Sequence, residues 1–163
     1  MSIFTQDNKR NLRKNPFDLS IEKKLSTGFG KLTPILCREV LPGDSAKVDT
    51  EIMTRFAPML APLMHRVNVF THYFYVPNRI IWDNWENFIS GGEDNDQNPT
   101  PPTVTYNEAN KAYFESGSMM DYLGFPAHDK NTPPTVTGSI EVNSLPLRAL
   151  AMIWNAMDRD WET

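Results

Sequence analysis

The run of residues 66–76 constrains the fold of this chain more than any other segment. It reads Arg-Val-Asn-Val-Phe-Thr-His-Tyr-Phe-Tyr-Val, and nearly all of these residues favour a pleated β-strand. Apolar and aromatic side chains fall on both faces of such a strand, so we expect it to be covered on both sides, by a second sheet or by another subunit. Pro77 ends the strand because it has no N–H group for the ladder.

Two more strands are predicted before this run. Residues 31–41 are rich in apolar and β-branched side chains and lead into the turn Pro42-Gly43-Asp44. Residues 47–56 alternate with a period of two, as a half-exposed strand does. Three strands do not close a sandwich or a barrel, and native proteins cover or pair open strand edges. The chain is therefore expected to be part of a larger β-structure.

A helix and a loop are predicted next. Asn78 is a candidate cap for a helix that ends at Gly91-Gly92. Its apolar residues recur at the spacing of one helical face, and they are Ile81, Trp82, Trp85, Phe88 and Ile89. Residues 93–105 are first acidic and then rich in proline, which predicts a loop.

Two further helices are predicted near the end of the chain. One covers residues 119–123, with Ser116 or Ser118 as its N-cap and Gly124 as its C-cap. The other follows Ser144 and has Pro146 in its first turn, where the missing N–H is harmless. Its apolar stripe consists of Leu147, Leu150, Ala151, Ile153, Trp154 and Met157.

The charge of the chain is distributed unevenly. Residues 1–31 hold seven lysines and arginines against three acidic residues, whereas the remainder holds nine basic and seventeen acidic residues. A basic arm ahead of an acidic body is typical of proteins whose arm contacts a polyanion or a neighbouring subunit. The alternative is a solvated terminus without a partner.

No motif in the sequence indicates catalysis, a metal site or a cofactor. Cys37 is the single cysteine, so no internal disulfide or cysteine-based zinc site can form. The three histidines, His65, His72 and His128, lack the spacing of a metal-binding helix, and the acidic run after Gly92 does not match a calcium loop. No apolar run approaches the roughly 20 residues that cross a bilayer. We therefore predict a non-enzymatic protein without cofactor, metal or membrane segment.

Six short segments stand in an order that identifies a family resemblance. They are Phe17-Asp18-Leu19-Ser20; Gly30-Lys31-Leu32-Thr33-Pro34 with Glu39-Val40-Leu41-Pro42-Gly43-Asp44; Phe74-Tyr75-Val76-Pro77-Asn78-Arg79; Trp82-Asp83-Asn84-Trp85-Glu86-Asn87-Phe88; Asp121-Tyr122-Leu123-Gly124-Phe125-Pro126; and Leu145-Pro146-Leu147-Arg148-Ala149 with Ile153-Trp154-Asn155. This order resembles the major capsid protein of microviruses, the small tailless icosahedral phages with single-stranded DNA, and especially its gokushovirus branch.

The resemblance implies a fold and a domain organisation. The expected fold is mainly β with helical insertions, a viral jelly roll in which eight antiparallel strands form a sandwich. This chain would carry only the first strands, as the truncated N-terminal third of the protein. Residues 1–27 would be the basic arm, residues 28–77 the early strands, and residues 78–163 a helical and loop insertion.

The resemblance also implies a structural function in the virion. About sixty copies would assemble in the cytoplasm of the bacterial host into a T=1 icosahedral shell around circular single-stranded DNA. Spike proteins or a small basic DNA-binding virion protein are further partners that the resemblance allows. An alternative function from another class is a non-catalytic β-sandwich module that binds a carbohydrate or another ligand.

Two groups of residues are the candidate sites. The arm residues Lys9, Arg10, Arg13 and Lys14 are candidates for neutralising DNA phosphates. Large aromatic residues are candidates for anchors, either in a subunit interface or in the core of the chain itself. These anchors are Phe74, Tyr75, Trp82, Trp85, Phe88 and Trp154.

Overall fold

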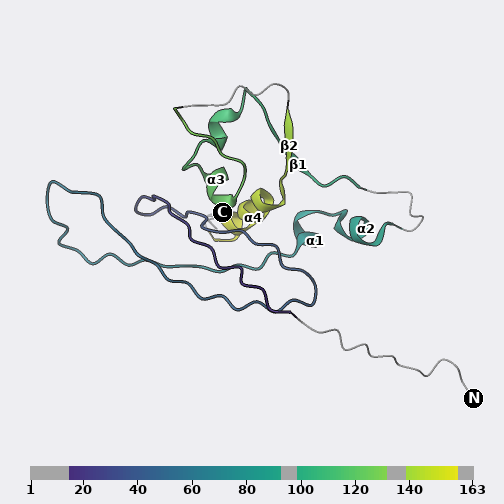
Figure 1. Ribbon diagram of the computed structural model, residues 1–163, viewed down its shortest axis with the longest axis horizontal. Coiled ribbons are helices and arrows are strands. Elements are labelled where there is room, and N and C mark those ends of the chain that lie inside the picture. The colour runs from purple at the N-terminus through teal and green to yellow at the C-terminus, as the bar shows by residue number, and fades with distance from the viewer. Residues whose placement is uncertain (1–14, 93–98, 132–138, 158–163) are drawn as a thin grey trace, which may run out of the picture.

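The structure is a computed structural model that describes residues 15–92, 99–131 and 139–157. Figure 1 shows a small group of helices and strands beside long loops. In chain order the elements are α1 (Asn78–Ile81), α2 (Trp85–Ser90), β1 (Thr103–Tyr106), η1 (Lys111–Phe114), α3 (Met119–Leu123), β2 (Ile140–Asn143) and α4 (Leu145–Met157).

The two strands form one antiparallel ladder, in which Thr103 pairs with Asn143 and Tyr106 pairs with Ile140. Neither strand was predicted, and β1 lies partly in the expected loop of residues 93–105. Helix α4 begins two residues after the end of β2. Between them, the amide and the hydroxyl of Ser144 both donate to the carbonyl of Pro102, each at 2.9 Å, which fixes this junction to the start of β1. The pairing thereby sets the position at which α4 begins.

A small aromatic core joins the ladder to the helices. Tyr106, Phe114, Leu123 and Phe125 are buried together, and Phe114 is only 1% exposed. The ring of Phe114 lies edge-on to Tyr106 at 4.9 Å and to Phe125 at 6.3 Å between centroids. Partly buried residues pack around this core, namely Val104, Met120, Val142, Leu147 and Leu150. We refer to the described residues from 99 to 157 as the body.

The predicted caps of α3 are confirmed. The Ser118 hydroxyl accepts a hydrogen bond from the amide of Asp121 at 3.3 Å, which satisfies one of the free N–H groups of the first turn. Gly124 adopts φ 94°, a left-handed conformation that closes the helix at little cost for glycine. The last predicted helix is also present as α4, with Pro146 in its first turn.

The helix predicted after Asn78 is wrong as a single element. It is divided into α1 and α2 by Trp82, whose backbone is extended at φ −151° and ψ 110°, and Asn78 is the first helical residue rather than a cap. Asp83 and Asn84 follow the break, and such residues favour turns over helix interiors. The end of α2 at the left-handed Gly91 is as predicted.

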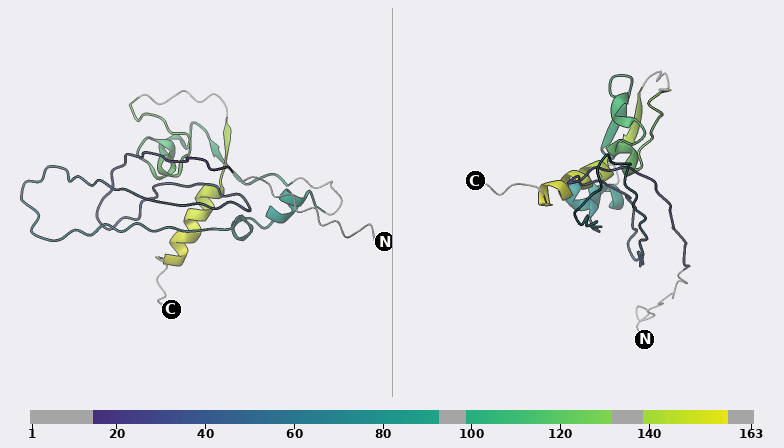
Figure 2. Two further views of the ribbon diagram at one scale, coloured as in Figure 1. Left: turned by 60° about the horizontal axis from the view of Figure 1, so that its bottom comes forward. Right: turned by 90° about the vertical axis from the view of Figure 1, so that its left-hand side faces the viewer.

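The three strands predicted over residues 31–41, 47–56 and 66–76 are not formed. In residues 15–77 the structure has no strand, and the one backbone-to-backbone hydrogen bond within residues 28–76 joins the amide of Asp44 to the carbonyl of Leu41. Figures 1 and 2 show this part of the chain as long loops to one side of the body. A strand requires a neighbour to pair its backbone groups, and these segments find none within the described chain. The few helices and strands of the described residues are consistent with part of a capsid domain. They do not form an eight-stranded sandwich.

Candidate assembly surface

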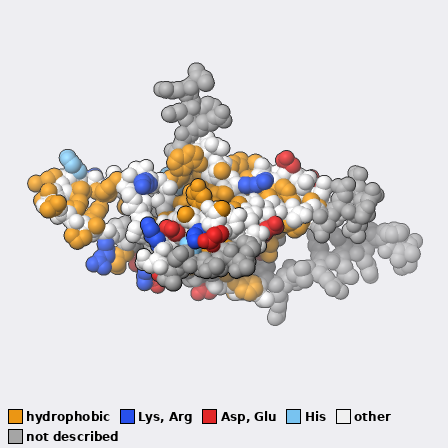
Figure 3. Space-filling model, turned by 90° about the horizontal axis from the view of Figure 1, so that it is seen from above, with side chains coloured by type: hydrophobic (Ala, Val, Ile, Leu, Met, Phe, Trp, Pro, Cys, Tyr) orange, Lys and Arg blue, Asp and Glu red, His pale blue; other side chains and the backbone are white. Residues whose placement is uncertain are grey.

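Most of the large apolar side chains between residues 35 and 75 are exposed. We call this set the open apolar surface: Ile35, Leu36, Val40, Leu41, Val48, Ile52, Met53, Phe56, Met59, Leu60, Leu63, Met64, Val69, Phe70, Tyr73, Phe74 and Tyr75. Figure 3 shows hydrophobic side chains gathered at the left end of the molecule, where the long loops lie. Soluble monomers rarely leave apolar patches of such extent uncovered, so this surface is a candidate for contact with other polypeptide.

The total accessible surface also indicates that this chain leaves an unusually large area uncovered. It is 15231 Å², whereas a compact monomer of 18.6 kDa exposes about 8,200 Å². The difference is more than the residues outside the described ranges could add even as extended chain. A large area of the described residues therefore stays open that a self-contained domain would bury.

The loops of this region touch one another through side chains. The hydroxyl groups of Thr50 and Tyr73 are hydrogen-bonded, and the rings of Phe29 and Phe56 stack at 6.2 Å between centroids. The hydrogen bond between Thr50 and Tyr73 brings residues 47–56 beside residues 66–76 without any ladder between them. Both segments therefore keep their backbone N–H and C=O groups available for pairing with other strands.

The predicted aromatic anchors occupy different environments. Trp82 is 8% exposed and packs against Trp85 and Phe88, with ring centroids 6.0 and 5.2 Å away. Trp85 is half-buried and Phe88 lies at the edge of this cluster. Trp82 is thus an anchor within the chain itself.

The other three predicted anchors lie at the surface. Tyr75 is 80% exposed and Phe74 is also exposed, both within the open apolar surface, and Trp154 on α4 is 51% exposed. The structure therefore does not gather the six aromatic residues into one site. The predicted basic residues Lys9, Arg10, Arg13 and Lys14 lie outside the described residues.

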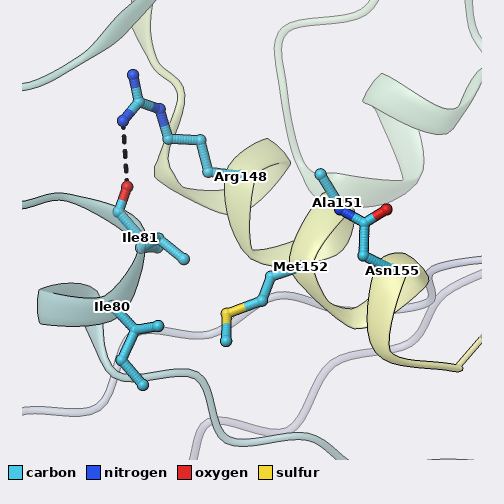
Figure 4. A pocket seen from close by; sticks show the side chains of 6 residues that line it. All are labelled: Ile80, Ile81, Arg148, Ala151, Met152 and Asn155. Atoms are coloured by element: carbon cyan, nitrogen blue, oxygen red, sulfur yellow. Dashed lines mark hydrogen bonds between the residues drawn. The ribbon is translucent and has the colours of Figure 1, made fainter. Parts of the chain in front are cut away.

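A shallow cleft of about 490 Å³ separates α1 from α4, and sequence reasoning missed it. Figure 4 shows its lining, which consists of Ile80, Ile81, Arg148, Ala151, Met152 and Asn155. One guanidinium nitrogen of Arg148 donates to the carbonyl of Ile81 at 3.1 Å and so ties the two helices together. The run Leu-Pro-Leu-Arg-Ala drew attention to Arg148, but no local pattern predicted its partner 67 residues away.

The described residues offer little catalytic chemistry. Partial desolvation raises the pKa of the Cys37 thiol above its ordinary value, so the nucleophilic thiolate is disfavoured. No group of three or more potential ligands among the described residues could hold a metal ion. In that same part of the chain, no helix is both long and apolar enough for a transmembrane span.

Charged side chains near the loops pair only locally. Lys24 lies 3.2 Å from Glu22, and Lys47 lies 2.9 Å from Asp49, with all four side chains largely exposed to water. Such pairs contribute at most about 1 kcal/mol each.

Comparison with known proteins points to one family. The family model described as Capsid protein (F protein) matches residues 7–162. The protein named Capsid protein VP1 of Bdellovibrio phage phiMH2K is 36% identical over 150 residues, which cover 90% of this chain and 26% of that protein. The proteins of the same name from Chlamydia phage 1 and Spiroplasma virus 4 are 33% and 32% identical and are covered over 24% and 22% of their length. The chain thus spans about a quarter of these relatives, and no solved structure matches it significantly.

Proposed function

This chain belongs to the Capsid protein (F protein) family, and on that premise we propose that it forms part of the shell of a small phage. Membership agrees with the prediction of a structural, non-enzymatic protein. It leaves the alternative of a carbohydrate-binding or other ligand-binding module without support. The observation that carries the proposal is the open apolar surface, which a capsid subunit would bury against further polypeptide.

The open apolar surface would be covered from two sources. The relatives are more than three times as long as this chain, so the remaining polypeptide of such a protein can supply neighbouring strands. Other copies can cover what is left, at roughly 25 cal/mol for each Å² of apolar area buried. Aromatic and methionine side chains suit this role because they bring large contact area. Phe70, Phe74 and Tyr75 are the candidates within the exposed set.

We further propose that residues 31–41, 47–56 and 66–76 become strands of a jelly roll once that polypeptide is present. The side-chain contact between Thr50 and Tyr73 supports this, because strands that face each other across a sandwich touch through side chains rather than through a ladder. The backbone groups of both segments would then pair with different neighbours. On this proposal residues 78–163 clothe the sandwich as an insertion.

The shell itself would hold about sixty copies in a T=1 arrangement and enclose single-stranded DNA. It would be built in the host cytoplasm and remain in the virion. The complete reading frame that contains this chain is expected to yield megadalton particles on expression, which sedimentation and electron microscopy would detect. A ligand-binding module would instead sediment as a monomer, and that result would overturn the proposed function.

The basic arm is proposed to contact the packaged DNA. Replacing Lys9, Arg10, Arg13 and Lys14 by glutamine should lower the slope of log affinity against log salt by about 3, since each cation that neutralises a single-strand phosphate contributes roughly 0.7. The measurement is binding of the complete protein to single-stranded DNA over a salt series. A matched variant that replaces Lys24 and Lys47, which pair with their own neighbours, should keep the slope. Equal slopes in both variants would contradict the arm's role.

A further inference from the structure

Besides the hydrogen bond between Arg148 and Ile81, a second long-range link joins residues 23–26 to helix α3. The ammonium group of Lys23 donates to the carbonyl oxygens of Asp121 at 3.2 Å and Tyr122 at 2.7 Å. The hydroxyl of Tyr122 donates to the carbonyl of Ser26 at 3.1 Å and accepts from the Ser26 amide at 3.5 Å. These four hydrogen bonds connect residues that are 96 to 99 positions apart in the sequence.

The chemistry of this link is that of a cation at a helix end. The last carbonyls of a helix have no N–H partner within it and carry partial negative charge, which a lysine ammonium satisfies. Lys23 also lies 6.0 Å from the centroid of the Tyr122 ring. Its neighbour Lys24 contrasts with it, because Lys24 is 88% exposed and pairs only with Glu22.

The Tyr122 side of the link is fixed by the body. The ring of Tyr122 is buried, and its helix is held at both ends by Ser118 and Gly124. The hydroxyl is therefore presented at a defined place, where both backbone groups of Ser26 reach it. A phenylalanine in the same position would fill the same space and lose both hydrogen bonds.

The link bridges an open groove. A groove of about 310 Å³ lies along the seam, lined by Lys24, Leu25 and Ser26 on one side and by Ser116, Gly117, Asp121 and Tyr122 on the other. The segment is thus held by a few polar contacts rather than by continuous apolar packing. Such contacts can break and reform while the aromatic core of the body stays intact.

We propose that residues 23–26 form a releasable strap, held on α3 by Lys23 and Tyr122, that fixes where the N-terminal segment leaves the body. The strap orients residues 15–22, which precede it, before any partner is bound. Release of the strap would give that segment a wider reach. This inference does not depend on the shell function, since the contacts lie within one chain.

The test compares Lys23→Met and Tyr122→Phe with the control Lys24→Met in the unassembled protein. Cleavage by chymotrypsin after the half-buried Leu25 measures strap opening, and this protease is chosen because Lys23→Met removes a tryptic site. Hydrogen bonds to a charged group typically change an equilibrium by tenfold or more. We expect Lys23→Met, which loses the two hydrogen bonds of the ammonium group, to be cleaved roughly tenfold faster than the parent. Tyr122→Phe loses two hydrogen bonds to neutral backbone groups and should be cleaved roughly threefold faster, whereas the control should be cleaved at the parent rate.

Two further measurements keep the strap separate from general unfolding. Hydrogen exchange at the amide of Phe125, which donates to Met120, reports on the end of α3 and should stay unchanged. The double variant should be cleaved little faster than Lys23→Met alone, since both anchors hold one strap. Equal cleavage of Lys23→Met and Lys24→Met, faster exchange at Phe125, or full additivity would each overturn the proposal.

Discussion

Phe114→Ala is expected to destabilise the body by about 3–5 kcal/mol, the typical cost of removing a buried phenylalanine ring. The residue is 1% exposed and its ring contacts both Tyr106 and Phe125, so truncation leaves a cavity at the centre of the core. A loss of this size is a large share of the stability of an ordinary domain, about 5–15 kcal/mol. Hydrogen exchange at the amides of β1 and β2 should therefore be faster by a factor of about one hundred or more.

The neighbouring Tyr113→Ala variant is the matched control. Tyr113 occupies the same short helix η1 but is 70% exposed, and substitutions at exposed positions usually change stability by no more than about 0.5 kcal/mol. Exchange in the two strands should remain close to that of the parent. Equal effects at Phe114 and Tyr113 would show that the aromatic core described above does not hold the body together.

Phe70→Asp should abolish particle formation while leaving the body folded. Phe70 is 75% exposed in this chain and lies in the open apolar surface, so it does not contribute to the stability of the body. If it becomes buried on completion of the fold or on assembly, the new carboxylate is desolvated without a partner, at a cost of several kcal/mol in every copy. Particle yield from the complete reading frame, measured by sedimentation, should drop at least tenfold.

Phe70→Leu separates the loss of apolar contact from the introduction of charge. Leucine keeps most of the buried area, so particles should still form. Exchange at β1 and β2 should match the parent in both variants, because neither touches the core. Normal particle yield from Phe70→Asp would mean that the open apolar surface stays exposed in the shell, and would remove the main support for its role in assembly.

The sequence predicted well those elements that are specified locally. The helix over Met119–Leu123 was found with both caps, because Ser118 and Gly124 each act within one turn of their position. The last helix was found from Pro146 in its first turn and from its apolar stripe, which are also local features. Local capping requires no knowledge of distant partners.

Elements that depend on distant partners were predicted poorly. The β1–β2 ladder was missed because each strand has four residues and is recognisable only through its partner 34 to 40 positions away. Residues 66–76 show the opposite case, where strong β-preference produces no strand because no neighbour is present to pair with it. The split at Trp82 was also missed, since the spacing of Trp82, Trp85 and Phe88 fits one face of an unbroken helix.

The candidate site was predicted in part. Of the aromatic residues predicted as interface or core anchors, Phe74 and Tyr75 are exposed and Trp82 is buried within the chain, and a role of the exposed ones in an interface stays a prediction. The links made by Lys23 and Arg148 could not be predicted, because each donates to backbone carbonyls, and any residue type can supply those. A sequence pattern therefore does not indicate which backbone carbonyl a distant side chain will bind.

The pairing of Tyr106 with Ile140 brings the two ends of the intervening stretch to one place. Residues 107–139 connect the two strands of the ladder. The length of this stretch therefore does not determine where β1 ends or where β2 begins. The entropy of closing such an excursion grows only slowly with added residues. Insertions in the loops of this stretch, away from the core residues Phe114, Leu123 and Phe125, would therefore leave the start of α4 in place.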